Sequence, residues 1–116
     1  VLNMARLNVD IKGVVSFHGS LGKAVDYTGP TSTKILVCNG ADDRMVGGDA
    51  ILRFKQEMDS IKADYEFINY SNSTHGFTNS EATINGEKFQ IGLAYNKEAD
   101  IESWKKMQSF FNQIFN

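Results

Sequence analysis

Three short apolar runs along the chain predict β-strands. They span residues 11–17, 35–38 and 65–70, and each is followed by glycine or by a polar loop. The first two runs are apolar at successive positions rather than at alternate ones, which is typical of parallel strands buried on both faces. The pattern therefore predicts a parallel sheet that is covered by helices on both sides.

A helix is predicted between the second and third runs, over residues 49–62. Its apolar side chains recur at the spacing of one helical face, at Ile51, Phe54, Met58 and Ile61. Asp49 is expected to be the N-cap, because its carboxylate can accept hydrogen bonds from backbone N–H groups of the first turn. The order strand, helix, strand predicts a βαβ unit with two parallel strands.

A second helix is predicted near the C-terminus, with acidic residues near its start, where negative charge is favourable. Its apolar stripe consists of Ile101, Trp104, Met107, Phe111 and Ile114. Trp104 and the phenylalanines are expected to cover the sheet, because they lie on this stripe. Residues 1–7 are interpreted as the end of another helix, residues 19–33 as a loop, and Asn85-Gly86 as a tight turn. The predicted fold class is α/β, with about three parallel strands and flanking helices.

Composition narrows the function classes. With 116 residues, of which 41% are hydrophobic and 22% charged, the chain can form one small globular core. The formal net charge is −2 and the basic residues are scattered, so we expect no nucleic-acid partner. No apolar run approaches the roughly 18 residues of a membrane span, and the single cysteine, Cys38, cannot form an internal disulfide. We therefore expect a cytoplasmic protein that does not contact membranes.

The first predicted strand has an unpaired edge. A sheet of three apolar strands would expose that edge, which is a template for pairing with another chain. We expect this edge to be covered by a segment outside residues 1–116, by a second copy of the chain or by a crystal contact, and the open edge favours self-association. The organisation is that of the last part of a larger doubly wound sheet.

Candidate catalytic side chains follow two neighbouring strands. Asp42 and Asp43 come directly after the second strand, and His75 lies in the loop after the third. Open α/β sheets keep their sites at the carboxyl ends of the strands, and neighbouring strands lie about 4.8 Å apart. An acid from one loop can therefore bond the imidazole from the other.

These residues resemble a known family. The pattern Gly40-x-x-Asp43-x-x-Val46, followed by His75-Gly76-Phe77, is similar to the acid and histidine motifs of the α/β-hydrolase superfamily. A resemblance to the dienelactone hydrolase family extends through residues 14–21, 54–58 and 94–104 and covers essentially the whole chain. It implies that residues 1–116 are the C-terminal portion of one α/β-hydrolase domain. It also implies a hydrolase of small esters or lactones, an esterase with Asp43 and His75 in a Cys/His/Asp catalytic triad.

The nucleophile of that triad has no counterpart in the sequence. No Gly-x-Cys-x-Gly or Gly-x-Ser-x-Gly turn occurs, so we expect the N-terminal half with the nucleophile elbow to be missing and this fragment to be inactive alone. Cys38 lies inside an apolar strand and is interpreted as a buried structural residue. His18, after the first strand, is interpreted as a loop or pocket-wall residue.

Two other functions remain open. The chain could be a noncatalytic α/β interaction module that works through its open edge, or a nucleotide-binding half of a doubly wound fold, although it has no phosphate loop. No cofactor or metal is expected, since a metal site from His18, Asp43 and His75 would need three loops to meet at one ion. The distance between Asp43 and His75 separates the hydrolase from the interaction module. A triad requires a hydrogen bond between these two residues, and without it the hydrolase interpretation has no physical basis.

Overall fold

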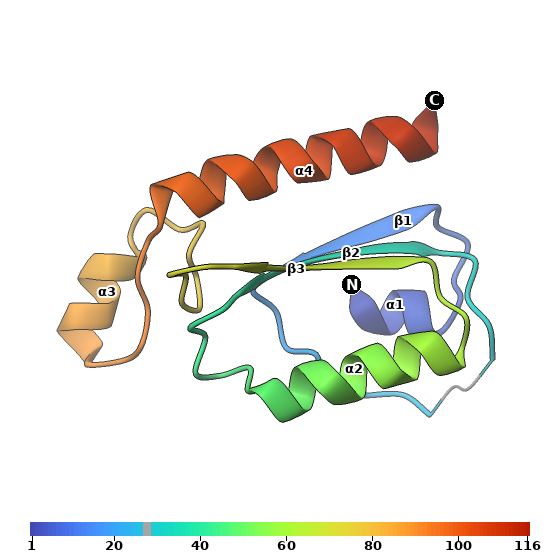
Figure 1. The fold of residues 1–116 in the computed structure, drawn as a ribbon, viewed down its shortest axis with the longest axis horizontal. Helices are drawn as coiled ribbons and strands as arrows, with labels where there is room; N and C mark the ends of the chain where they lie inside the picture. The colour runs from blue at the N-terminus through green and yellow to red at the C-terminus, as the bar shows by residue number, and fades with distance from the viewer. Residues whose placement is uncertain (27–28) are drawn as a thin grey trace.

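Three parallel strands form the centre of the structure, with helices on both faces of the sheet (Figure 1). The structure is a computed structural model that describes residues 1–26 and 29–116, so Tyr27 and Thr28 of the predicted 19–33 loop lie outside the described residues. In chain order the elements are α1 (Leu2–Arg6), β1 (Gly13–Phe17), β2 (Lys34–Gly40), α2 (Gly48–Ser60), β3 (Tyr65–Tyr70), α3 (Ala82–Phe89) and α4 (Lys97–Phe115). Helices α1 and α2 lie on one side of the sheet, α4 lies on the other, and α3 lies beyond the carboxyl ends of the strands (Figure 1).

The sheet has the order β1-β2-β3, and both strand pairs are parallel. In the register, Val15 of β1 lies opposite Leu36 of β2, and Val37 of β2 lies opposite Phe67 of β3. Strand β2 is therefore central, and all of its residues except Lys34 are buried. The predicted α/β fold, the parallel sheet and the βαβ unit are confirmed, although the first strand begins at Gly13 rather than at residue 11.

The core is divided by the sheet into two layers, which explains why β2 is apolar at successive positions. Ile35 and Val37 pack with residues of α1 and α2 on one face. Leu36 and Cys38 pack on the other face with Tyr70, Phe77 and Ala99 of α4. Because a strand alternates its side chains, only a continuous apolar run can supply both layers.

The start of α2 differs from the prediction. The helix begins at Gly48, and its N-cap is Gly47, whose backbone is extended at φ −73° and ψ 164°. Asp49 lies inside the first turn and is not the N-cap. Glycine is itself an acceptable N-cap, and Asp49 still places its negative charge near the positive end of the helix dipole.

The turn predicted at Asn85-Gly86 is wrong, because both residues lie inside α3. Gly86 is required by packing rather than by a turn. A Cβ atom at this position would overlap the carbonyl oxygen of Leu93 and would lie 3.1 Å from the carbonyl oxygen of Ile91. The glycine therefore allows the segment after α3 to pass directly against the helix.

The prediction that Trp104 covers the sheet is also wrong, because its side chain is 55% exposed. The buried face of α4 is centred instead on Ala99 and Ser103, and it continues through the partly buried Met107 and Phe110. The apolar residues of α4 extend over more than one face of the helix. The sequence pattern therefore allows the face through Trp104 and also the neighbouring face through Ala99 and Phe110, which is the one that packs on the sheet.

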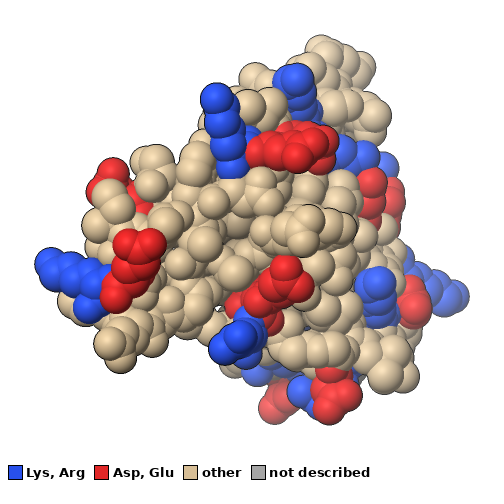
Figure 2. Space-filling view, turned by 60° about the vertical axis from the view of Figure 1, so that its left-hand side comes forward, with Lys and Arg blue, Asp and Glu red and all other residues tan. Residues whose placement is uncertain are grey.

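The surface carries charges of both signs. Acidic and basic side chains are interspersed on the face shown in Figure 2, and no broad field of one sign covers it. Within the described part of the chain, no helix combines the length and the apolar composition that crossing a bilayer requires.

Candidate active site

Two loops meet where β2 and β3 end: the acid loop, residues 41–47, and the histidine loop, residues 71–81. The backbone N–H of Ala41 donates to Tyr70 O at 2.9 Å, and that of Asp42 donates to Ser73 O at 2.9 Å. Gly40 allows this approach, since a Cβ atom there would overlap the carbonyl oxygen of Ser73 and lie 2.8 Å from that of Thr74. The end of β2 is thus held directly against the loop that carries the histidine.

Asp43 is directed into the protein and not into solvent. The residue is only 4% exposed, and both carboxylate oxygens have donors. Oδ1 accepts the backbone N–H of Met45 at 2.8 Å, and Oδ2 lies 2.9 Å from Nδ1 of His75. The neighbouring Asp42 is exposed. The structure therefore brings Asp43, and not Asp42, to the histidine.

The bond to Asp43 orients the imidazole of His75. A carboxylate accepts, so Nδ1 carries the proton, and Nε2 is left with a lone pair that can accept one. The His75 side chain is 30% exposed, so part of it remains accessible to solvent. His75 is thus oriented as a base beside a buried acid.

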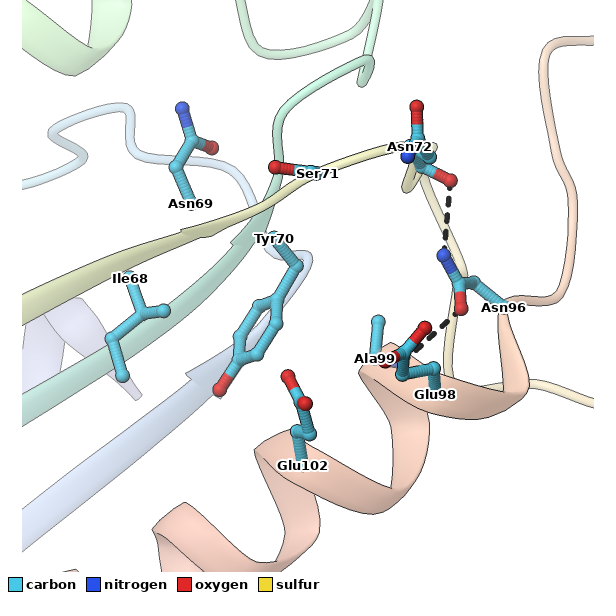
Figure 3. A pocket seen from close by; sticks show the side chains of 9 residues that line it. All are labelled: Ile68, Asn69, Tyr70, Ser71, Asn72, Asn96, Glu98, Ala99 and Glu102. Carbon is cyan, nitrogen blue, oxygen red and sulfur yellow. Dashed lines mark hydrogen bonds between the residues drawn. The ribbon is translucent and has the colours of Figure 1, made fainter.

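Polar contacts to the segment before α4 fix the histidine loop. Thr74 Oγ1 accepts the N–H of Ala94 at 2.8 Å. Asn96 Nδ2 donates to Asn72 O and to Ser73 Oγ, both at 3.0 Å. Its Oδ1 caps α4 by accepting the N–H of Ala99, and Figure 3 shows the bonds to Asn72 and Ala99. These contacts border a hollow of about 370 Å³ between the end of β3 and the start of α4. The loop therefore has a fixed position independent of Asp43.

His18 lies next to His75. Its Nε2 is 2.9 Å from Thr78 Oγ1, and its ring centroid is 5.5 Å from that of His75 in an edge-on arrangement. Burial lowers the pKa of His18, and the nearby His75 lowers it further. The sequence indicated a loop or wall residue without a partner, and it gave no signal for Thr78, which lies 60 residues away along the chain.

The sequence also matches a known protein family. Residues 1–115 match the Dienelactone hydrolase family. The chain belongs to the dienelactone hydrolase family. A search of the curated proteins finds no significant match.

Solved structures of dienelactone hydrolase-like proteins share the fold. A dienelactone hydrolase-like promiscuous phosphotriesterase from metagenomic libraries superposes with a TM-score of 0.86 at 31% identity, over 97% of this chain and 46% of that protein. A protein named m3DLH gives a TM-score of 0.89 at 31% identity, over 99% of this chain and 47% of that protein. A protein of Klebsiella pneumoniae subsp. pneumoniae MGH 78578 gives 0.70 at 20% identity, over 94% of this chain and 45% of that protein, and supports the fold alone. The chain thus spans about half the length of these relatives.

Cys38, the single cysteine of this dienelactone hydrolase family member, is a poor nucleophile. It is fully buried on β2, and burial raises the pKa of its thiol to about 11. At neutral pH the thiol therefore stays protonated, whereas catalysis requires the thiolate. Its position in the core agrees with the structural role expected from the sequence.

His18, Asp43 and His75, the residues considered for a metal site, bond to protein side chains. His18 Nε2 is bonded to Thr78, while Asp43 is bonded to His75. Among residues 1–26 and 29–116, no group of three or more His, Cys, Asp or Glu side chains is placed to hold an ion. The geometry of the described site allows His75 Nε2 to accept and donate a proton.

Proposed function

We propose that this chain supplies the acid, Asp43, and the histidine, His75, of a Cys/His/Asp triad in a hydrolase of small esters or lactones. The observation that carries the proposal is the 2.9 Å bond between His75 Nδ1 and Asp43 Oδ2, made by a carboxylate that is almost completely buried. Membership of the dienelactone hydrolase family supports a hydrolase. The preorganised couple supports acyl transfer by general base and general acid steps.

In this mechanism His75 transfers one proton in each of two half-reactions. Nε2 takes the proton of a cysteine thiol as the thiolate attacks the ester carbonyl, and the imidazolium then gives it to the leaving alkoxide. Asp43 holds Nδ1–H throughout, so it fixes the tautomer and stabilises the imidazolium. In the second half, Nε2 takes a proton from the water that attacks the acyl-enzyme. The bond from carbon to sulfur then breaks, the carboxylic acid is released, and the imidazolium returns the proton to the cysteine thiolate.

We further propose that the nucleophile comes from outside residues 1–116. The sequence contains no Gly-x-Cys-x-Gly or Gly-x-Ser-x-Gly turn, and Cys38 is buried with a raised pKa. The 116-residue chain alone should therefore hydrolyse an aryl ester at the buffer rate. A measurable rate that Cys38→Ser abolishes would contradict this assignment.

A chimera tests the proposal with a nucleophile present. Residues 1–116 replace the matching part of m3DLH, and the purified chimera is assayed on an aryl ester. We expect turnover, a loss of about 10⁴-fold in kcat with Asp43→Asn, and a comparable loss with His75→Ala. Asp42→Asn is the matched control and should leave kcat unchanged, because Asp42 is exposed.

Two outcomes would redirect the proposal. If a folded chimera turns over ester and Asp43→Asn has no effect, Asp43 is not the acid of the site. If a folded chimera is inactive and the 116-residue chain self-associates by sedimentation velocity, the chain is better described as an interaction module. An aryl phosphotriester is worth including as a second substrate, because one relative at 31% identity is a promiscuous phosphotriesterase.

A further inference from the structure

The backbone of His18 adopts a conformation that side chains other than glycine rarely adopt. It lies directly after β1 with φ +38°, while its N–H donates to Cys38 O at 2.8 Å and so extends the pairing with β2. A left-handed backbone is strained in a residue other than glycine, because its Cβ atom approaches the following carbonyl oxygen. Such strain persists only where surrounding contacts hold it. Here the contacts are the backbone bond to Cys38 and those made by the imidazole.

The imidazole of His18 lies among residues of the histidine loop. Nε2 bonds Thr78 Oγ1 at 2.9 Å, three residues beyond His75. The ring meets that of Phe77 edge-on at 5.4 Å between centroids, and Phe77 is completely buried. The same ring meets His75 at 5.5 Å. His18 therefore contacts the loop at three residues, Thr78, Phe77 and His75. These contacts come from the end of β1, whereas other hydrogen bonds to residues 72–77 come from the acid loop and from residues 94–96.

We propose that His18 is a positioning residue for His75: fixed to Thr78, it holds its ring edge against the His75 imidazole and keeps that imidazole bonded to Asp43. The inference rests on the proposed function, because it assumes that the bond between Asp43 and His75 matters. It assigns Thr78 a supporting role, since Thr78 holds His18 in place.

The charge state of His18 is compatible with this role. Burial and the neighbouring His75 both lower the pKa of His18, while its own backbone and Asp43 raise it to a lesser extent. A neutral His18 does not repel the imidazolium that His75 becomes during catalysis. A lysine or arginine at this position would repel it.

The test uses NMR of the ¹⁵N-labelled 116-residue chain, which contains only two histidines. The readouts are the tautomer of His75 and its low-field Nδ1–H resonance, which reports the bond to a carboxylate. Thr78→Val, which keeps the shape but removes the hydroxyl, should broaden the resonance and mix the tautomers. His18→Ala should abolish the resonance, and His18→Phe should retain it partly because the ring edge remains.

A control separates positioning from general instability. Val14→Ala removes apolar contacts from the opposite face of the sheet, so it should destabilise the chain and leave the His75 resonance intact. If Val14→Ala weakens the resonance as much as Thr78→Val at equal loss of stability, His18 has a merely structural role. An unchanged resonance in both His18→Ala and Thr78→Val would also overturn the proposal.

Failure of the two proposals can be distinguished. Asp43→Asn should shift the Nδ1–H resonance to higher field; if it does not, the couple between Asp43 and His75 is wrong. If it does shift while the His18 and Thr78 variants behave as wild type, only the positioning role fails. In an active chimera, Thr78→Val should lower kcat about tenfold with KM unchanged.

Discussion

Gly40→Ala is the substitution that should most directly separate the acid from the histidine. Gly40 ends β2, and the acid loop starts at the next residue. The added methyl group would overlap Ser73 O and would lie 2.8 Å from Thr74 O, although ordinary contact begins at 3.4 Å. Both obstacles are backbone atoms of the histidine loop, so no side chain can rotate away. The two loops must therefore move apart.

The loss of stability in Gly40→Ala can be derived from the distance by which the two loops must separate. The contact at Thr74 requires about 0.6 Å, and the one at Ser73 requires more. A shift of this size lengthens the bond from Asp42 N to Ser73 O from 2.9 Å to about 3.5 Å, where a hydrogen bond is lost. Overpacking and one lost bond together should lower the free energy of unfolding by about 2–4 kcal/mol. Domains of this size have about 5–15 kcal/mol, so the variant should still fold.

Urea unfolding followed by circular dichroism measures the stability, and the Nδ1–H resonance of His75 reports the site. Gly48→Ala is the control: it lies in the first turn of α2, nothing approaches its added Cβ within 4 Å, and stability should be unchanged or rise by up to about 1 kcal/mol. The reasoning is refuted if Gly40→Ala unfolds at the wild-type urea concentration and keeps the His75 resonance.

Three further predictions concern buried groups. Glu57→Gln should lower the free energy of unfolding, measured by urea titration, by about 2–4 kcal/mol, because the buried Arg6, only 1% exposed, would lose its carboxylate partner. The control Lys55→Gln, at an exposed residue of the same helix, should have little effect. Burial lowers the pKa of His18 from 6.5, so His18 gains its proton at a higher pH in the unfolded chain than in the folded one. The free energy of unfolding should therefore fall as the pH drops below about 6.5, and it should fall less in His18→Phe. Cys38, with its pKa raised to about 11, should react with a thiol reagent only as fast as the chain unfolds, and a fast reaction with folded protein would contradict its burial.

The sheet could be predicted because its physical requirement is local. A strand buried on both faces must be apolar at successive positions, and residues 35–38 show this directly. The buried face of α2 could be predicted as well, because Phe54, Met58 and Ile61 are buried as their spacing indicated. The buried face of α4 could not. Helix α4 has apolar residues on several faces, and only the position of the sheet decides that Ser103 is buried and Trp104 exposed.

The contact between His18 and the histidine loop could not be predicted for a different reason. Thr78 carries no periodic or motif signal, and the bond joins residues far apart in sequence. The positive φ of His18 is likewise a consequence of tertiary contacts, because the local sequence does not favour it. Gly86 is a similar case, since its need arises from the return of residues 91–93.

The choice between Asp42 and Asp43 shows how local backbone geometry selects a functional residue. The N–H of Asp42 is bonded to Ser73 O, and the N–H of Asp43 is bonded to Gly40 O at 3.1 Å, so the chain turns between them. Because successive side chains along a turn point in different directions, only one of the two can face His75. The turn continues with Val46 N–H donating to Asp43 O, which closes the loop around the buried carboxylate. Asp43→Asn should therefore shift the Nδ1–H resonance of His75 to higher field in ¹⁵N NMR spectra, whereas Asp42→Asn should leave it unchanged, although the two residues are adjacent and chemically identical.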